Sequence, residues 1–145
     1  MFEYLRGRSG RAEFWASVGI LIVVTVALAL LKLNGAGGVM MFLWLLIWAR
    51  RLHDLNRSSL WGLLPFGVIL VLTVVAVTVG GNDLMDAVTY GQTGAGKITD
   101  KGLQVLLGFA LAVLVVQGGF TIWLGSRRGD AGTNRFGPPP AGLTS

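Results

Sequence analysis

The residues of this chain best suited by type to proton transfer are a histidine and the aspartate that follows it. His53 and Asp54 lie in the segment RRLHDLNRSSLW, which ends at Trp61. An imidazole titrates near neutral pH, so His53 could give or take a proton under physiological conditions. Adjacent residues on a helix point about 100° apart, so the two side chains would not form a catalytic dyad with each other.

Helix-end chemistry gives the same segment a structural interpretation. Cations such as Arg50 and Arg51 complement the dipole at the C-terminus of a helix. Asp54 has arginines within reach of a salt bridge on both sides: Arg50, Arg51 and Arg57. Residues able to cap a helix end follow, and they are Asn56, Ser58 and Ser59. We therefore expect capping and lipid contact here, and no catalytic residue.

The N-terminal segment GRSGRAEFW combines arginines, small residues and one acid. Ser9 or Gly10 can cap a helix, and Glu13 would fall in its first turn, where the dipole favours negative charge. Arg6, Arg8 and Arg11 would face anionic lipid headgroups, each worth about 1 kcal/mol near the surface. Together with the arginines of the RRLHD segment they could form a cytoplasmic anion pocket, and a general positive rim is the alternative.

The sequence does not predict a metal, cofactor or nucleotide site. The chain has no cysteine and a single histidine, so a zinc site would need several carboxylates nearby. GQTGAGK, from Gly91 to Lys97, fits the spacing of a phosphate-binding loop, but Ile98 stands where a Ser or Thr should bind magnesium. We interpret this run as a flexible glycine-rich loop. The net charge of +5 does not indicate nucleic acid, because the arginines gather at helix ends.

The elements that position these residues are predicted to be membrane-spanning helices. Only 13% of the residues are charged and 53% are hydrophobic, unlike a soluble domain. A helix needs about 20 apolar residues to cross the hydrocarbon core, and four stretches qualify. We expect an all-α integral membrane protein, a four-transmembrane-helix bundle in one domain of residues 1–137. Its parts are spans at 14–33, 36–50, 59–80 and 102–125, an external loop at 81–101, and a flexible proline-rich tail at 138–145.

The first two predicted spans each have an alternative interpretation. The charge-free stretch 33–49 would rise only about 25 Å, so Arg50 and Arg51 would have to extend it by snorkelling to the headgroups. A re-entrant hairpin is the alternative, because irregular backbone is tolerated at membrane depth when protein buries it. The first span could be a signal peptide, but its apolar run exceeds the usual length, so we expect a retained anchor.

Basic residues and tryptophans indicate the same orientation. Nine arginines fall at the termini and in the second loop: Arg6, Arg8, Arg11, Arg50, Arg51, Arg57, Arg127, Arg128 and Arg135. Three lysines fall on the opposite side: Lys32, Lys97 and Lys101. Cytoplasmic loops carry the excess of basic residues, so both termini should be cytoplasmic. Four indole rings fall at the predicted cytoplasmic boundary, where such rings are favoured: Trp15, Trp48, Trp61 and Trp123.

The fourth predicted span has a pattern typical of close helix packing. Small residues let two helix backbones approach, and a buried amide can hydrogen-bond a neighbouring helix. The residues of the pattern are Gln104, Gly108, Ala112 and Gly119. We expect this face to pack within the chain, with homodimerisation as the alternative.

Three motifs stand in order along the chain: GRSGRAEFW, RRLHDLNRSSLW and GDAGTNRFGPPP. Together they resemble the motifs of a bacterial inner-membrane family catalogued as domain of unknown function 805. The matching positions that we take as a motif face are Arg8, Arg11, Glu13, Trp15, Arg50, Arg51, His53, Asp54, Ser58, Asn134, Arg135, Phe136 and Gly137. The chain departs from the family in Ser59-Leu60, where Gly-Trp is usual, and in a longer stretch between the second and third motifs. The resemblance implies a multi-pass protein of the bacterial plasma (inner) membrane and no known activity.

Three functions compete on this basis. We favour a non-enzymatic interaction or accessory membrane protein whose motifs form one basic cytoplasmic face. The alternative is a small transporter or channel component, although Gln104 and Gln117 are the only strongly polar candidates within its spans. Less favoured is a lipid-headgroup enzyme using His53, Asp54 and the arginines, because a second reactive motif is missing. The expected partners are the bilayer with its anionic headgroups, and another copy of the chain or another membrane protein.

Overall fold

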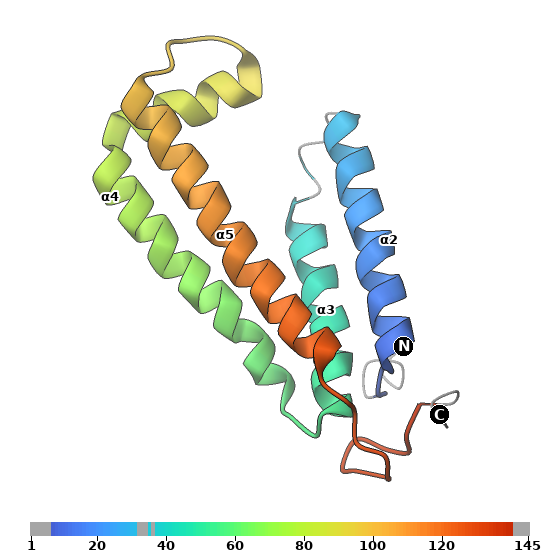
Figure 1. Cartoon of the computed structure of the whole chain (residues 1–145). Helices are drawn as coiled ribbons and strands as arrows, with labels where there is room; N and C mark the ends of the chain where they lie inside the picture. Colours follow the sequence, from blue (N-terminus) through green and yellow to red (C-terminus); the bar gives the residue numbers. More distant parts are fainter. Residues whose placement is uncertain (1–6, 32–34, 36, 141–145) are drawn as a thin grey trace. The chain divides into compact units, whose positions relative to one another are not determined.

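Helices form the named elements in the part of the chain that the computed structural model describes, residues 7–31, 35 and 37–140. In chain order they are α2 (Arg11–Leu30), α3 (Gly37–Asp54), the 3-10 helix η2 (Ser59–Leu63), α4 (Leu64–Thr93) and α5 (Asp100–Ser126), drawn in Figure 1. The predicted all-α class is therefore confirmed. Lys32 and the end of the predicted tail, 141–145, lie outside the described residues.

Among the described residues, three stretches of helix are long and apolar enough to cross a membrane: Arg11–Leu30, Ser59–Thr93 and Asp100–Ser126. They correspond to the first, third and fourth predicted spans. The second predicted span lies in α3, whose final turns carry Arg50, Arg51, His53 and Asp54. These polar residues leave α3 an apolar stretch shorter than the roughly 20 residues of a typical span.

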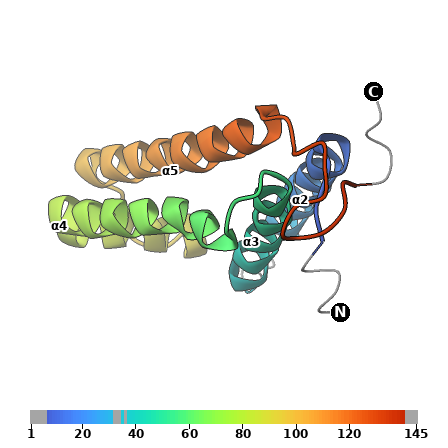
Figure 2. The ribbon, with the colours of Figure 1, turned by 90° about the horizontal axis from the view of Figure 1, so that it is seen from below.

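The N-terminal half and the end of the chain form one compact unit, Met1–Leu63 with Thr121–Ser145. Within it α2 and α3 lie side by side in both views (Figures 1 and 2). α2 buries Phe14, Val18 and Leu21, whose spacing of four and three places them on one helix face. Most of its other apolar side chains are exposed, as expected of a helix surrounded by lipid.

The core of this unit joins α3 to the last turns of α5. Trp48 is fully buried, and its indole Nε1 donates to the Thr121 hydroxyl over 3.2 Å. On α5, Gly125 lies against the indole of Trp15, and a Cβ at this glycine would overlap the ring. A hydrogen bond and a close glycine contact therefore fix the end of α5 within this unit.

The second compact unit is Leu64–Phe120, in which α4 and most of α5 run alongside each other (Figures 1 and 2). At Gly81, with φ 52° and ψ −133°, α4 bends sharply, and Figure 1 shows its last part turned from the axis of the first. This backbone conformation favours glycine because it has no Cβ. Helix continues beyond the bend to Thr93, whereas we expected a loop from 81 to 101. Leu84 and Ala87, three residues apart, provide the buried face that stabilises it.

The non-helical connection is limited to residues 94–99, which include the glycine-rich run. Gly94 and Gly96 have φ values of 71° and 106°, a left-handed backbone that favours glycine and lets the chain turn here. Thr99 then caps α5, because its hydroxyl accepts from the Gly102 amide over 3.0 Å. The same hydroxyl donates to Asp83 over 3.0 Å, which ties the bent end of α4 to the start of α5.

Candidate functional site

The candidate site begins where α3 ends. The Arg57 amide donates to the Leu52 carbonyl over 2.8 Å, and the Asn56 amide donates to the His53 carbonyl over 3.1 Å. This pair of bonds is a Schellman motif, which needs a left-handed residue just after the helix. Asn56 supplies it with φ 55°, as its predicted capping role requires. The turn also holds Arg51 and Asp54 in the last, buried turn of α3.

Ser58 starts the next helix as predicted. Its hydroxyl accepts from the Leu60 amide over 3.3 Å at the first turn of η2. The other predicted cap, Gly10, precedes α2 without a side-chain bond, and its carbonyl accepts from the Phe14 amide over 2.9 Å. Glu13 lies in the first turn of α2, as expected.

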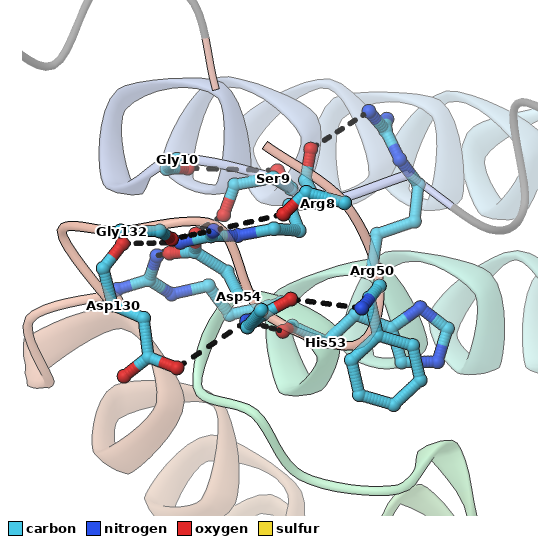
Figure 3. Close-up of polar contacts among 12 residues, drawn as sticks. Arg8, Ser9, Gly10, Arg50, His53, Asp54, Asp130 and Gly132 are labelled. Carbon is cyan, nitrogen blue, oxygen red and sulfur yellow. Dashed lines mark hydrogen bonds and ion pairs between the residues drawn. The ribbon is translucent and has the colours of Figure 1, made fainter. Parts of the chain in front are cut away.

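A buried carboxylate, Asp54, is the centre of the site (Figure 3). One of its oxygens accepts from Arg51 Nη1 at 2.5 Å, and the other lies 2.9 Å from Arg8 Nη2. The side chains of Arg8 and Asp54 are each 1% exposed, and that of Arg51 is 0% exposed. Of the three arginines expected to pair with Asp54, only Arg51 does so. Arg50 pairs with Glu13 instead, and Arg57 lies over the Trp61 ring.

Arg8 joins the N-terminal segment to the C-terminal segment. Besides Asp54, its guanidinium donates to three backbone carbonyls near the end of the chain: those of Asp130, Gly132 and Gly137. The bond to Gly132 is 2.6 Å long and the bond to Gly137 is 3.3 Å long. A planar guanidinium with five N–H groups suits such a set of acceptors, whereas a lysine could not reproduce it.

Arg51 makes a corresponding set of contacts inside the site. It donates to the Ser9 carbonyl and, through Nε, to the Leu124 carbonyl, each over 3.1 Å. It also donates to the Arg127 carbonyl, at the end of α5. The two guanidiniums and one carboxylate thus bind the N-terminal segment, the end of α3 and the chain after α5 together. We call Arg8, Arg51 and Asp54, with the carbonyls they contact, the buried clasp.

The third motif folds into a turn that packs on α3. Asn134 and Gly137 exchange two backbone hydrogen bonds of 3.1 and 3.0 Å, and Gly137 has φ 121°. The Asn134 amide group donates to the His53 carbonyl over 3.0 Å. Phe136 stacks on the His53 ring, with centroids 4.0 Å apart and planes 9° apart. Arg135 donates to the Asn56 carbonyl over 3.2 Å and lies over the Phe136 ring.

A glycine that we did not single out from the sequence is essential to this packing. A Cβ at Gly129 would overlap the Asp54 carboxylate, so the backbone approaches the buried acid as closely as a glycine allows. The Asp130 amide next to it donates to the Asp54 carbonyl over 2.9 Å. The only sequence signal was the place of Gly129 at the start of the third motif.

The rim of the site is more exposed than its centre. Arg50 Nη1 lies 2.6 Å from Glu13, whose side chain is 43% exposed. Arg11 is exposed, and Trp15 is 43% exposed while its indole packs on Gly125. Every residue of the predicted motif face lies in the compact unit of Met1–Leu63 and Thr121–Ser145.

The predicted helix-packing residues belong to the part of α5 in the other unit. Gly108 and Gly119 each face open space there, and Gln104 is exposed.

Burial dominates the electrostatics of the clasp. It lowers the pKa of Arg51, and the Asp54 carboxylate opposes that shift. Burial likewise lowers the pKa of His53 below 6.5, a hydrogen bond with the Gly7 backbone opposes the shift, and the charge of Arg135 adds to it. The Nδ1 atom of His53 is buried and has no hydrogen-bond partner among the described residues. Neutral His53 stacked on an aromatic ring is therefore the favoured form near pH 7.

This arrangement is suited to holding segments together rather than to a reaction. Its carboxylate is doubly paired, and both guanidiniums donate to backbone carbonyls. Within residues 7–31, 35 and 37–140, no three His, Cys, Asp or Glu side chains are grouped so that they could hold a metal ion. The cluster carries one net positive charge, because two cations share one acid.

Comparison with known proteins agrees with the three motifs. A family model described as "Protein of unknown function (DUF805)" matches residues 2–138. The "Inner membrane protein YhaH" of Escherichia coli strain K12 is 36% identical over 97 residues, covering 53% of this chain and 80% of that protein. The protein of the same description in Escherichia coli O157:H7 gives the same values. No solved structure matches the chain.

Proposed function

The chain belongs to the DUF805 family, and from this premise we propose that it is a non-enzymatic, multi-pass inner-membrane protein that acts as an interaction or accessory protein. In this proposal the family motifs build a structural clasp that presents a basic cytoplasmic face. The similar Escherichia coli protein is described as an inner membrane protein, and the long apolar helices of this chain fit the same membrane.

The observation that carries the proposal is that the buried motif side chains, Arg8, Arg51, His53 and Asp54, are engaged in internal contacts. A general acid or base must reach a substrate proton within about 3 Å, directly or through one water. Asp54 is 1% exposed and paired with two arginines, and the His53 ring is covered by Phe136. Neither group offers an open reaction site, which supports a structural role.

The clasp also supports a topology with both termini on one side. Arg8, Asp54 and Asp130 meet at one place, which supports a shared side of the membrane for the segments before α2, after α3 and after α5. In the topology that we propose, the chain crosses the membrane an even number of times between Arg8 and Asp54, and again between Asp54 and Asp130. Two spans in each interval give the four-helix topology, and a re-entrant α3 would need α2 to return as well. The excess of arginines near these segments supports the cytoplasm as that side.

Reporter fusions test the topology directly. Fusions at Gly35 and Gly94 should be external, and a fusion at Asn56 should be cytoplasmic. A fusion at Leu143, which lies outside the described residues, should also be cytoplasmic. A cytoplasmic signal at Gly94, or opposite signals at Asn56 and Leu143, would contradict the topology.

A pair of variants tests the absence of catalysis. His53→Gln removes the titratable ring but keeps a hydrogen-bonding group of similar bulk, so phenotype should fall only as far as protein abundance falls. Glu13→Gln, at the exposed rim, is the matched control for changing a motif side chain. Membrane protein level and cellular phenotype are measured together for each variant. Normal abundance with lost function in His53→Gln would overturn the non-enzymatic proposal.

A further inference from the structure

Four of the arginines near the ends of the helices fall into two contrasting classes. Arg8 and Arg51 direct their N–H groups inward, to Asp54 and to backbone carbonyls. Arg57 and Arg127 instead lie over the exposed indole rings of Trp61 and Trp123, at 5.6 and 5.7 Å from the ring centroids. Within the described residues, neither guanidinium of this second class has a hydrogen-bond acceptor or a carboxylate partner.

Each of the two Arg–Trp pairs lies at one end of an apolar helical stretch. Trp61 lies in η2, at the start of the apolar stretch Ser59–Thr93, and Trp123 lies in the last turn of α5. Both pairs belong to the same compact unit. A tryptophan at such a boundary anchors at the headgroup level of the bilayer, where its apolar body and its N–H are both favoured.

A guanidinium held over an indole gains from the ring quadrupole and can still donate to an anion. Arginine binds phosphate oxygens through paired N–H groups, and such charge-assisted bonds are about twice as strong as neutral ones. Each pair therefore combines a cation with free donors and an aromatic surface at the predicted level of the lipid phosphates.

Apolar surface beside each pair favours a lipid over a small soluble anion. Leu60, next to Trp61, is 71% exposed, and Ile122, next to Trp123, is 61% exposed. The acyl chains of a phospholipid can cover these apolar side chains, whereas inorganic phosphate has no apolar part that could do so.

We propose that the Arg57–Trp61 and Arg127–Trp123 pairs are binding sites for the headgroups of anionic phospholipids. This inference rests on the proposed function, because it names the partner of the basic cytoplasmic face. The rest of the positive rim contributes long-range attraction, and these two pairs provide the close contacts.

The experiment measures how tightly the purified protein, in a neutral detergent, retains phosphatidylglycerol, with phosphatidylcholine and inorganic phosphate as separate arms. We take the close contact of each paired arginine with a headgroup to be worth about 1 kcal/mol, the usual net value of a hydrogen bond, which is about a five-fold change in affinity. Arg57→Gln and Arg127→Gln should each lower phosphatidylglycerol affinity about five-fold, and the double variant about 25-fold. Phosphatidylcholine binding should change much less, and inorganic phosphate should not compete.

Arg128→Gln is the matched control, because Arg128 neighbours Arg127, is exposed, and has no ring contact within the described residues. It should lower affinity less than Arg127→Gln does. Equal losses at the two positions would show a diffuse positive rim and overturn the proposal. Competition by inorganic phosphate, or equal retention of the two lipids, would also overturn it.

A second pair of variants keeps the charge and removes the ring. Trp61→Leu and Trp123→Leu should weaken phosphatidylglycerol binding while their elution from gel filtration stays that of the unchanged protein. Unchanged binding in both would contradict a role for the rings, and it decides the question even if the arginine variants fail to fold. If the unchanged protein retains phosphatidylglycerol and phosphatidylcholine equally while the reporter signals at Asn56 and Gly94 are correct, this inference alone is refuted. A wrong reporter signal would refute the proposed topology instead.

Discussion

Replacing the buried carboxylate is the sharpest test of the clasp. Asp54→Asn keeps the shape of the side chain and one oxygen acceptor but removes the negative charge between Arg8 and Arg51. All three side chains are at most 1% exposed, so the two guanidiniums would be left in a poorly hydrated site without a counter-charge. Removing one member of a buried ion pair costs about 3–5 kcal/mol. We expect Asp54→Asn near the lower end of that range, because the amide oxygen can still accept a hydrogen bond.

The exposed pair at the rim provides the comparison. Glu13 is 43% exposed and lies 2.6 Å from Arg50, and such a solvated pair is worth about 0–1 kcal/mol. A difference of about 2–3 kcal/mol corresponds to roughly a 30- to 160-fold change in the unfolding equilibrium. Asp54→Asn should therefore unfold at clearly lower denaturant concentration than Glu13→Gln.

The assay is unfolding of the purified protein in detergent micelles, followed by tryptophan fluorescence as a denaturing detergent is added. A double-mutant cycle with Arg8→Gln shows whether the loss comes from the contact itself. Neighbouring residues in one network usually show a coupling energy of about 0.5–3 kcal/mol. Equal stability of Asp54→Asn and Glu13→Gln, or strict additivity with Arg8→Gln, would refute the buried clasp.

Three further predictions follow from single contacts. Gly129→Ala should destabilise the protein by about 1–3 kcal/mol in the same assay, because the new methyl group overlaps the buried carboxylate. Gly132→Ala is its control, since a Cβ there meets nothing within 4 Å, and an equal loss would contradict the close approach. The lowered pKa of His53 means that the unfolded chain binds a proton first, so stability should fall as pH drops below about 6.5. His53→Gln should remove this dependence, and its persistence would assign it to another group. Thr99→Ala should cost about 1 kcal/mol, because the α5 cap is lost, whereas Thr99→Ser should restore it.

The sequence predicted the local features of the site well. The chemistry of a helix end is set by residues close in the chain, so the left-handed Asn56 and the Ser58 cap could be read from residue type. The place of Glu13 in the first turn of α2 was predictable for the same reason. Helical class and apolar length likewise follow from composition and spacing, which are local properties.

Contacts between distant segments were not predictable in the same way. Arg8 and Asp54 are 46 residues apart, and nothing in the RRLHD segment indicates that Arg8, rather than Arg50 or Arg57, completes the pair. The donors of Arg8 and Arg51 go to backbone carbonyls, which every residue has and no sequence pattern marks. The helix from Gly81 to Thr93, where we expected a loop, is weakly marked in the sequence because its buried face is only Leu84 and Ala87.

The clasp has a consequence for the order in which the chain can reach its final state. Arg8 and Arg51 emerge early in synthesis, but their acceptors on Leu124, Arg127, Asp130 and Gly132 come only in the last turn of α5 and after it. Until then two guanidiniums share one acid, and their remaining donors must stay hydrated, because an unpaired buried cation is costly. Burial of the site therefore waits for the third motif, which couples the ends of the chain. The C-terminal segment can close the clasp only if α4 and α5 have returned it to the side of Asp54. The clasp can therefore form only in a chain whose three family motifs have reached the same side of the membrane.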